Sequence, residues 1–469
     1  MPVPHEQLKQ LLAAPLKDED LQKQSLRAVL QNVQGNILHS HGRDFAAHIF
    51  LQFKDGQQQR VKEWLHHNIV GKILSAQDQL AERKQYPTSQ NRPALFVTCF
   101  LSAWGYWFFG WCDPMDLFSA EFAGGMKQAK GRLHDPLSPP WEENYQQESH
   151  AMILVAHSEQ NVLDKTIYKL ETQLSQLTTR YWIERGEVLR RDGRRVEHFG
   201  YAGDGASQPL FFQQDLDKEE RERGIDQWNP GAGPQLVLTH DPLGGALDYG
   251  SYLVFRKLEQ DVEGFAAQLR TLTDQLRRLK NDDAQWIDEE YAAALVAGRF
   301  RNGQPLIHHT ISWAPPGLHR TLIPNNFRYD MDWNGQLCPF HAHARRMNPR
   351  WETNLAEYDR RIARRGIPYG VPGTKPVGLL FMCYQQSLKN QFEALQGEWA
   401  YTPKDFPPSG YDGLIGRKLA PSSTGGQHWH IQGGTTEAFI GNCVTLKGGE
   451  YFFAPSLNVL RNLLRRPRL

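Results

Sequence analysis

The sequence predicts an α+β protein made of duplicated ferredoxin-like domains, with helices packed on antiparallel sheets. Residues 48–177 follow the order strand, helix, strand, loop, strand, helix, which is the order of a ferredoxin-like unit. A strand leading into a long amphipathic helix recurs after residue 250, beyond a loop rich in glycine, proline and aspartate. The chain of 469 residues is also longer than one ordinary hydrophobic core requires, which favours duplication.

The first half follows a charged amphipathic extension over residues 1–30, and we place its domain over residues 31–215. Apolar, β-rich runs predict its strands, and segments with helical spacing of apolar residues predict its helices. The expected strands are residues 48–53, 94–100 and 150–157, and the expected helices are residues 57–76 and 160–177.

One stretch of the first half, residues 94–112, carries no charge and approaches the length of a membrane span. Its first part is β-rich, whereas its second part is aromatic and contains Gly105 and Gly110. We therefore expect a buried strand followed by a core helix, and no contact with a membrane.

The second half, residues 216–469, begins within a loop-rich stretch that runs from Asp204 to Leu247. A strand at residues 252–258 leads into a helix whose Val262, Phe265, Leu269 and Leu272 share one face. Later in this half, we expect strands at residues 377–386 and 444–455 and a helix at residues 390–400.

Composition excludes several classes of function. The 53 basic and 52 acidic residues leave a net charge of +1, which gives no electrostatic reason to bind nucleic acid or an anionic membrane surface. Five widely spaced cysteines without a CxxC pair indicate reduced thiols, and the N-terminus lacks a long apolar segment after a basic start. We expect a cytoplasmic protein.

The segment of residues 338–370 carries the most distinctive chemistry. It places His341 and His343 two residues apart, between Pro339 and Pro349, which restrict the backbone on either side. One of these imidazoles is a candidate metal ligand, and a structural or surface role remains the alternative. His428 and His430 also have the spacing of a strand-borne metal pair, but they lack further ligands nearby and we assign them no role.

The same segment resembles the proximal heme-ligand region of the dye-decolorizing peroxidases, whose pattern is approximately CPxxAHxRxxNPR followed by RRGIPYG. The matching residues are Cys338, Pro339, Ala342, His343, Arg345, Asn348, Pro349, Arg350 and the run from Arg364 to Gly370. Further matches reach from Gln34, in a QGNIL run that opens the family's first strand, to Leu460. The resemblance implies an H2O2-dependent peroxidase that carries heme b in its C-terminal half, with His343 as the axial iron ligand.

Asp412 lies in SGYDGLIG, which resembles the family's GxDPIIG. The resemblance implies that its carboxylate accepts a hydrogen bond from His343, which would increase the basicity of the ligand. Gly413 stands where the family often has proline. From the residues alone, a plain turn residue between Tyr411 and Gly413 is the favoured interpretation of Asp412.

Asp204 lies in FGYAGDGASQP, which resembles the family's GxxDG fingerprint with its distal acid–base aspartate. This chain has one extra residue between Gly200 and Asp204, which could displace the carboxylate by up to about 3.5 Å. We expect Gly203 to absorb the extra residue through a positive φ. The alternative is an ordinary Asp-Gly turn.

Arg364 precedes the GIPYG run that, in the family, follows a distal arginine, so the resemblance assigns it to the stabilisation of charge on peroxide. The spacing of Arg360, Arg361, Arg364 and Arg365 is otherwise typical of a solvated basic helix face. Leu379, Leu380, Phe381 and Phe453 are candidate walls of a heme pocket or ordinary core residues. Arg299, in a run similar to the family's GRWxxGxPL, is a candidate propionate contact.

Two functions therefore compete. In the first, the protein reduces H2O2 and oxidises bulky aromatic or dye-like donors in one-electron steps, with an acidic pH optimum because its acid–base group is a carboxylate. In the second, a heme-binding or heme-handling protein of the same fold has weak turnover because the extra residue misplaces Asp204. A non-heme protein of two α+β domains is a third reading. The donor and the oligomeric state, a homo-oligomer included, stay open.

Overall fold

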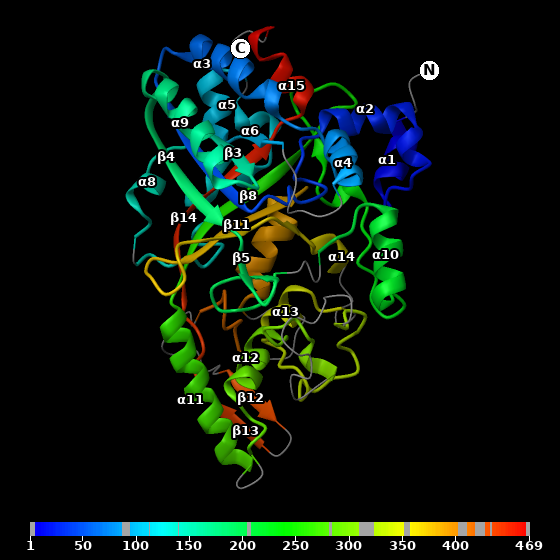
Figure 1. Cartoon of the computed structure of the whole chain (residues 1–469), viewed down its shortest axis with the longest axis vertical. Helices are drawn as coiled ribbons and strands as arrows, with labels where there is room; N and C mark the ends of the chain where they lie inside the picture. Colours follow the sequence, from blue (N-terminus) through cyan, green and yellow to red (C-terminus); the bar gives the residue numbers. More distant parts are fainter. Residues whose placement is uncertain are drawn as a thin grey trace.

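The computed structural model describes residues 5–86, 94–111, 113–138, 140–203, 208–280, 284–308, 323–350, 357–401, 410–417, 427–431 and 434–465. Its centre is one long antiparallel sheet, with strand order β10-β11-β8-β14-β2-β3-β1-β4 and two short strands, β7 and β9, paired to β8 and β11. Figure 1 shows helices packed around this sheet and a smaller lower region that includes α11, α12, β12 and β13.

The first half of the sheet is one ferredoxin-like unit. Its strands are β1 (Phe45–Phe53), β2 (Phe96–Leu101), β3 (Ala151–His157) and β4 (Thr178–Glu187), and they lie in the order second, third, first, fourth. Helices α3 (Gln58–Asn68), α4 (Ala76–Gln85) and α9 (Gln160–Leu177) make the two crossovers. Every residue of β3 is buried, because the strand is central and both its faces are covered.

The second half repeats the same order. Its strands are β8 (Tyr249–Gln260), β10 (Ile367–Tyr369), β11 (Gly378–Gln385) and β14 (Val444–Ala454). Helix α11 (Val262–Lys280) lies in the first crossover, and a π-helix, η7 (Leu388–Trp399), makes the second. The duplication that the sequence predicts is thus present as two units with one strand order.

The two units share one sheet. Strand β14 pairs with β2 through Phe453 and Leu101, which joins the fourth strand of one unit to the second strand of the other. At the far ends of the strand order, β10 packs against β4. A side chain at Gly186 of β4 would come within 2.4 Å of Ile367 in β10, so glycine permits this approach. The strands therefore curve into a barrel-like arrangement.

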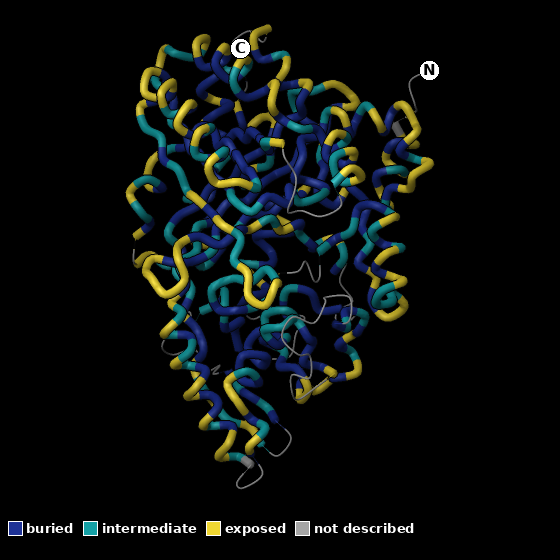
Figure 2. The backbone as a smooth tube through the Cα atoms, in the orientation of Figure 1, coloured by how far each residue is buried: buried dark blue, intermediate teal, exposed yellow. Residues whose placement is uncertain are grey.

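The remaining elements cover this barrel or extend from it. Buried residues concentrate at the sheet and in a second cluster around α11, α12 and β12, while exposed residues follow the outer helices and loops (Figure 2). Their bounds are α1 (His5–Leu12), α2 (Gln24–Asn32), α5 (Ala103–Phe109), α6 (Pro114–Leu117), α7 (Ala120–Ala129), α8 (Glu143–Gln146), α10 (Gln213–Arg223), α12 (Glu289–Ala297), α13 (His343–Met347), α14 (Glu357–Arg360), α15 (Leu457–Arg461), β5 (Leu189–Arg191), β6 (Arg194–Val196), β7 (Thr239–His240), β9 (Ala363–Arg364), β12 (His428–Ile431) and β13 (Gly434–Glu437).

The uncharged stretch folds as the sequence predicts, with β2 followed by the short helix α5. Ser102 caps α5 by accepting a hydrogen bond from the amide of Gly105, and Gly110 ends the helix in a left-handed conformation. Within the described ranges, no helix is long and apolar enough to cross a bilayer.

Several local predictions differ from the structure. Residues 34–38 form a buried turn in which Asn36 has a φ of 71°, so the first strand begins later, at Phe45. Strand β4, which directly follows α9, was not predicted, because its intermediate and exposed positions interrupt the apolar alternation. The expected boundary at residue 215 falls inside α10. The arginine-rich run after residue 360 is extended rather than helical.

Candidate active site

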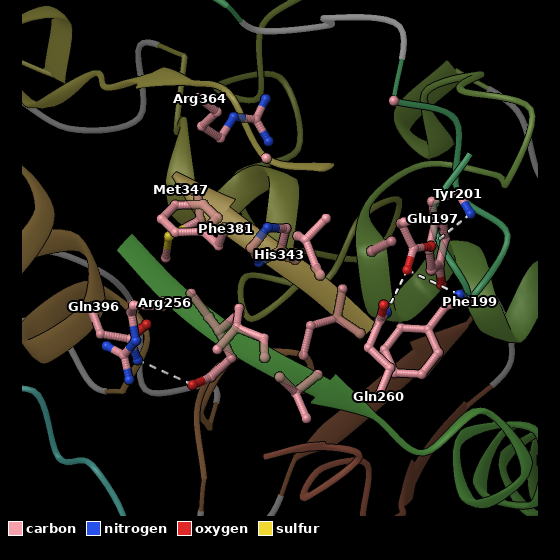
Figure 3. A pocket seen from close by; sticks show the side chains of 18 of the residues that line it. Glu197, Phe199, Tyr201, Arg256, Gln260, His343, Met347, Arg364, Phe381 and Gln396 are labelled. Carbon is pink, nitrogen blue, oxygen red and sulfur yellow. Dashed lines mark hydrogen bonds between the residues drawn. The ribbon is translucent and has the colours of Figure 1, made fainter. Parts of the chain in front are cut away.

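A cavity of about 870 Å³ lies where the two units meet the segment that carries His343. Strands β8 and β11, the start of β14, helix α13, the π-helix η7 and the loop after β6 all line it. In Figure 3, Arg364 lies on one side of His343, while Arg256 and Gln396 lie toward one end and Glu197 and Gln260 toward the other. This is the size range of sites for small molecules and cofactors.

His343 is the first residue of α13, and its side chain is 29% exposed within this cavity. Its Nδ1 lies 2.7 Å from Oδ2 of Asp412, whose side chain is fully buried. An ionised carboxylate can only accept a hydrogen bond, so Nδ1 carries the proton. The neutral imidazole then keeps a lone pair on Nε2, which is the atom able to bind a metal.

Asp412 is itself held by the backbone. Its Oδ1 accepts hydrogen bonds from the amides of Leu414 at 2.8 Å and Ile415 at 3.1 Å. Its own amide donates to the carbonyl of Ala400 at the end of η7. A Cβ on Gly413 would lie 3.1 Å from Ile440, so a larger residue there requires the neighbour to move. The Asp412 carboxylate is thus fixed before any ligand binds.

Arg364 enters the same cavity from β9, where it pairs with Cys383 of β11. Its amide donates to Oε1 of Gln208 at 3.0 Å. The side chain of Arg364 is exposed to the space of the cavity. Protein atoms nevertheless surround that space, and the loss of surrounding water lowers the pKa of the guanidinium. An arginine remains charged even so, because its ordinary pKa is above 12.

The neighbouring arginines are structural. Arg361 donates to the carbonyls of Pro230 and Gly231, and Arg365 donates to those of Asn36 and Ile37. Burial lowers the pKa of Arg361 and Arg365 to about 10 in each case. The arginine run therefore anchors two distant loops, and two of these three arginines, Arg361 and Arg364, line the cavity.

The apolar wall comes from alternate residues of β11. Leu379 and Phe381 line the cavity, whereas Leu380 is fully buried on the opposite face of the strand. Side chains alternate between the two faces of a strand, so of these predicted wall residues Leu379 and Phe381 reach the cavity and Leu380 does not. Phe453 is also not part of the lining; it packs in the core against Phe118.

Residues 204–207 lie outside the described residues, so the position of the Asp204 carboxylate is not assigned. On either side of this gap, Gly203 and Gln208 both line the cavity. Among the described residues of this loop, Gly200 has a positive φ of 96°, whereas Gly203 does not, contrary to expectation.

Glu197 organises the loop before Gly203. Val196 and Ala202 form an antiparallel bridge, and between them the partly buried Glu197 carboxylate accepts hydrogen bonds from the amides of Phe199 and Tyr201, each at 2.9 Å. Gln260 of β8 donates to the same carboxylate (Figure 3). Burial raises the pKa of Glu197. Sequence reasoning missed this residue because its contacts depend on the folded loop.

Arginines stand at the edges of the cavity. Arg299 donates to the carbonyl of Gly303 at 2.9 Å and to Oδ1 of Asn325 at 3.0 Å. Arg256 forms a buried ion pair with Asp135, and its Nε and Nη1 have no hydrogen-bond partner among the described residues. The sequence analysis did not single out Arg256. Its position within a predicted strand does not indicate that it lines a cavity.

These features fit a heme group. The cavity offers an imidazole with a free Nε2, an apolar wall on β11, and buried arginine N–H groups that lack acceptors. A flat apolar macrocycle with an iron centre and two carboxylates would satisfy each of them. Within the described residues, no cluster of three or more His, Cys, Asp or Glu side chains forms an alternative metal site.

The other three histidines that the sequence analysis considered, His341, His428 and His430, do not line this cavity. His341 is buried against Trp429, with ring centroids 4.5 Å apart, and burial lowers its pKa to about 3. His428 lies 3.3 Å from Glu437, and His430 bonds to Thr435 across the same hairpin.

Comparison with known families places two models on this chain. A model described as the DyP dimeric alpha+beta barrel domain matches residues 32–189, and one described as Dyp-type peroxidase, C-terminal, matches residues 237–405.

Individual proteins match over nearly the full length. The Multifunctional dye peroxidase DyP2 of Amycolatopsis sp. is 36% identical, covering 93% of this chain and 96% of that protein. The Dye-decolorizing peroxidase msp1 of Mycetinis scorodonius is 28% identical, and the match covers 93% of this chain and 87% of that protein. Among solved structures, a DyP-type peroxidase of Anabaena sp. superposes with a TM-score of 0.84 at 35% identity, covering 95% of this chain and 96% of that one.

Proposed function

Because the chain belongs to the Dyp-type peroxidase family and is a peroxidase, we propose that it reduces H2O2 and oxidises bulky aromatic or dye-like donors in one-electron steps. The observation that carries this proposal is the His343–Asp412 pair, 2.7 Å apart, in a cavity that Arg364 also lines. A solved dye-decolorizing peroxidase complex with 2,6-dimethoxyphenol shares the fold, with a TM-score of 0.72 at 24% identity.

The family implies a heme cofactor, and we propose heme b, whose iron Nε2 of His343 would bind. Leu379 and Phe381 would contact the macrocycle, and Arg299 and Arg256 are the candidate partners of its propionates. When bound, the heme iron supplies the redox chemistry for the reduction of peroxide and the oxidation of the donor.

On the proximal side, Asp412 keeps the proton of His343 on Nδ1 and fixes the orientation of the ring. A carboxylate in this position makes the imidazole a stronger electron donor. Both oxygens of Asp412 accept hydrogen bonds from described groups, so its geometry is maintained without help from solvent.

On the distal side, we propose that Asp204 takes the proton from the near oxygen of H2O2 and returns it to the far oxygen, which then leaves as water. Arg364 stabilises the negative charge that develops on peroxide, because a guanidinium does not give up its own proton. The flanking residues Gly203 and Gln208 support this placement, since both line the cavity and Gln208 accepts from the amide of Arg364.

The substitution Asp204→Asn tests the distal assignment. An amide cannot accept the proton, so the rate constant for the reaction with H2O2 should fall by roughly 10²–10⁴ while heme content stays unchanged. Rapid mixing of heme-loaded protein with peroxide measures this constant, and Asp192→Asn, in the turn between β5 and β6, is the control. A wild-type rate in Asp204→Asn removes Asp204 from the reaction.

The rival reading, a heme-handling protein with weak turnover, makes a different prediction. Dye oxidation measured from acidic to neutral pH should show a maximum at acidic pH if a carboxylate is the acid–base group. Tight heme binding with negligible turnover at every pH would favour heme handling instead.

We also propose that the chain divides into an extension of residues 1–30, a first domain of residues 31–215 and a second domain of residues 216–469. Because residue 215 lies inside α10, the boundary between the two domains should fall outside that helix. We propose a cytoplasmic location, which is supported by the buried, reduced cysteines of the described ranges: Cys99, Cys338, Cys383 and Cys443. We assign no nucleic-acid or membrane partner. Sedimentation of the heme-loaded protein would decide whether it forms a homo-oligomer.

A further inference from the structure

A second cavity, of about 360 Å³, opens on the first ferredoxin-like unit. It is lined by β1, β14, the helices α5 and α7, and the residues around the end of α8. As described, its lining has no residue in common with that of the large cavity. Its volume lies within the range of small-molecule sites, about 300–1,000 Å³. Nothing in the proposed peroxidase chemistry uses it.

A buried carboxylate forms the base of this second cavity. Glu450 of β14 is only 5% exposed, and its Oε1 accepts hydrogen bonds from the amides of Met126 at 2.9 Å and Tyr451 at 2.8 Å. Its Oε2 accepts no hydrogen bond from any described residue. The backbone at Gly125 has a φ of 70°, and a Cβ there would lie 3.2 Å from Oε1, so glycine lets α7 approach. This oxygen, on a largely buried side chain that lines the cavity, is left to accept a hydrogen bond from a ligand.

A single ammonium group faces this carboxylate among the lining residues. Nζ of Lys127 donates to the carbonyls of Gln146 at 3.0 Å and Gln147 at 2.7 Å, which leaves one N–H for the cavity. Glu148 contributes a second carboxylate, 3.9 Å from Nε2 of His150. Burial lowers the pKa of His150 to about 4, so this imidazole does not offset the charge of Glu148 at neutral pH.

The rest of the lining is amide and aromatic. The carboxamides of Gln52, Gln128 and Gln147 make no hydrogen bond to a described residue, and each presents both donors and an acceptor. Trp104, 40% exposed, supplies a flat apolar ring. The Glu450 carboxylate and the Lys127 ammonium are therefore surrounded by groups that can both donate and accept hydrogen bonds.

The groups that line the second cavity favour some classes of ligand over others. An anion would meet the carboxylates of Glu450 and Glu148. A cation would leave the free N–H of Lys127 and the carboxamide N–H groups without acceptors, which costs free energy in a pocket. Hydroxyl groups both donate and accept, so vicinal hydroxyls satisfy the carboxylate, the ammonium and the carboxamides together.

We propose that the second cavity binds a neutral polyhydroxylated ligand of one or two sugar units, with the C–H face of a ring against Trp104. The proposal does not depend on the peroxidase activity. It covers both a free sugar and the end of a polysaccharide chain, which present the same hydroxyl chemistry.

Calorimetric titration of the heme-loaded full-length protein tests the proposal. The probes are glucose, cellobiose and cellohexaose, with spermidine and inorganic phosphate as charged alternatives. We expect saturable binding of at least one sugar with a Kd at or below about 10 mM. Trp104→Ala and Gln128→Ala should each weaken it at least about fivefold, and peroxide turnover should not change. A tighter Kd for cellohexaose than for glucose would indicate a polysaccharide.

The control is Trp333→Ala, which removes another exposed indole outside both linings and should leave sugar binding unchanged. Gln128 is exposed, so its substitution tests the site without disturbing the core. Absence of saturation with all three sugars would overturn the proposal. So would preferential binding of spermidine or phosphate, or sugar binding that survives both substitutions.

Discussion

The two sides of the large cavity are built in different ways. On the His343 side, one short helix and the residues 410–417 form a hydrogen-bonded unit in which every oxygen of Asp412 is used. On the Arg364 side, the lining is assembled from distant pieces: β9, Gln208 and the loop after β6 that Glu197 holds. In the proposed function, the first side would hold the iron ligand and the second the groups that act on peroxide.

This difference separates two measurable quantities. Substitutions on the His343 side should change the affinity for heme and its reduction potential. Substitutions on the Arg364 side should change the rate with peroxide while heme binding stays constant. The comparison holds if substitutions on one side change only heme binding and substitutions on the other change only the rate with peroxide. It fails if a single substitution changes both.

The largest effect within this comparison is expected for Arg364→Leu. Removing the charge that stabilises the breaking O–O bond should lower the rate constant with H2O2 by roughly 10²–10³. Heme affinity should stay within about twofold. Arg360→Leu, which removes a nearby arginine that does not line the cavity, should react at the wild-type rate. Loss of heme from Arg364→Leu would contradict the division between the two sides.

A smaller effect is expected for Asp412→Asn. The amide accepts the Nδ1–H of His343 more weakly than a carboxylate does, so heme affinity or activity should fall roughly 10–100-fold. The reduction potential should rise, because a less basic imidazole stabilises ferric iron less. Potentiometric titration measures this, with Asp330→Asn, at an exposed ion pair, as the control. An unchanged potential would show that the pair does not tune the iron.

Glu197→Gln should have a modest effect on rate and a distinct effect on stability. The amide weakens the loop anchor by about 1–3 kcal/mol, so we expect the peroxide rate to fall up to about tenfold. Burial raises the pKa of Glu197 above its ordinary value of 4.5, so the folded state holds this proton more tightly than the unfolded state. Stability from this group is therefore lost as pH rises through the raised pKa.

Denaturant unfolding at several pH values measures how the contribution of Glu197 to the free energy of unfolding changes with pH. The wild type should lose stability relative to Glu197→Gln as the pH rises above about 4.5. A difference that is constant with pH would mean that Glu197 does not titrate in this range.

The smallest effect is expected for Gln208→Ala. It removes the acceptor of the Arg364 amide, a single hydrogen bond worth about 0.5–1.5 kcal/mol, so the peroxide rate should fall roughly two- to tenfold. Gln213→Ala, at the start of α10, is a matched amide deletion outside the cavity lining. Equal rates in both variants would separate Gln208 from the positioning of Arg364.

Contiguous motifs in the sequence singled out His343, Asp412 and Arg364 as candidates. The structure places His343 and Arg364 in one cavity lining and Asp412 beside His343, while their chemical roles stay predictions. The choice between Leu379 and Leu380 needed only the period of two in a strand. Glu197 carries no motif, and its role arises from a loop bridged between Val196 and Ala202. Strand β4 was missed because its exposed positions obscure the alternation.

The central claim is that Nε2 of His343 binds the heme iron. Titrating heme into heme-free protein and recording the optical spectrum tests this most directly. The account predicts stoichiometric binding with a sharp Soret band in the wild type, a weakened and altered spectrum in His343→Ala, and recovery of that variant's spectrum when free imidazole is added. A wild-type spectrum and affinity in His343→Ala without imidazole would contradict it.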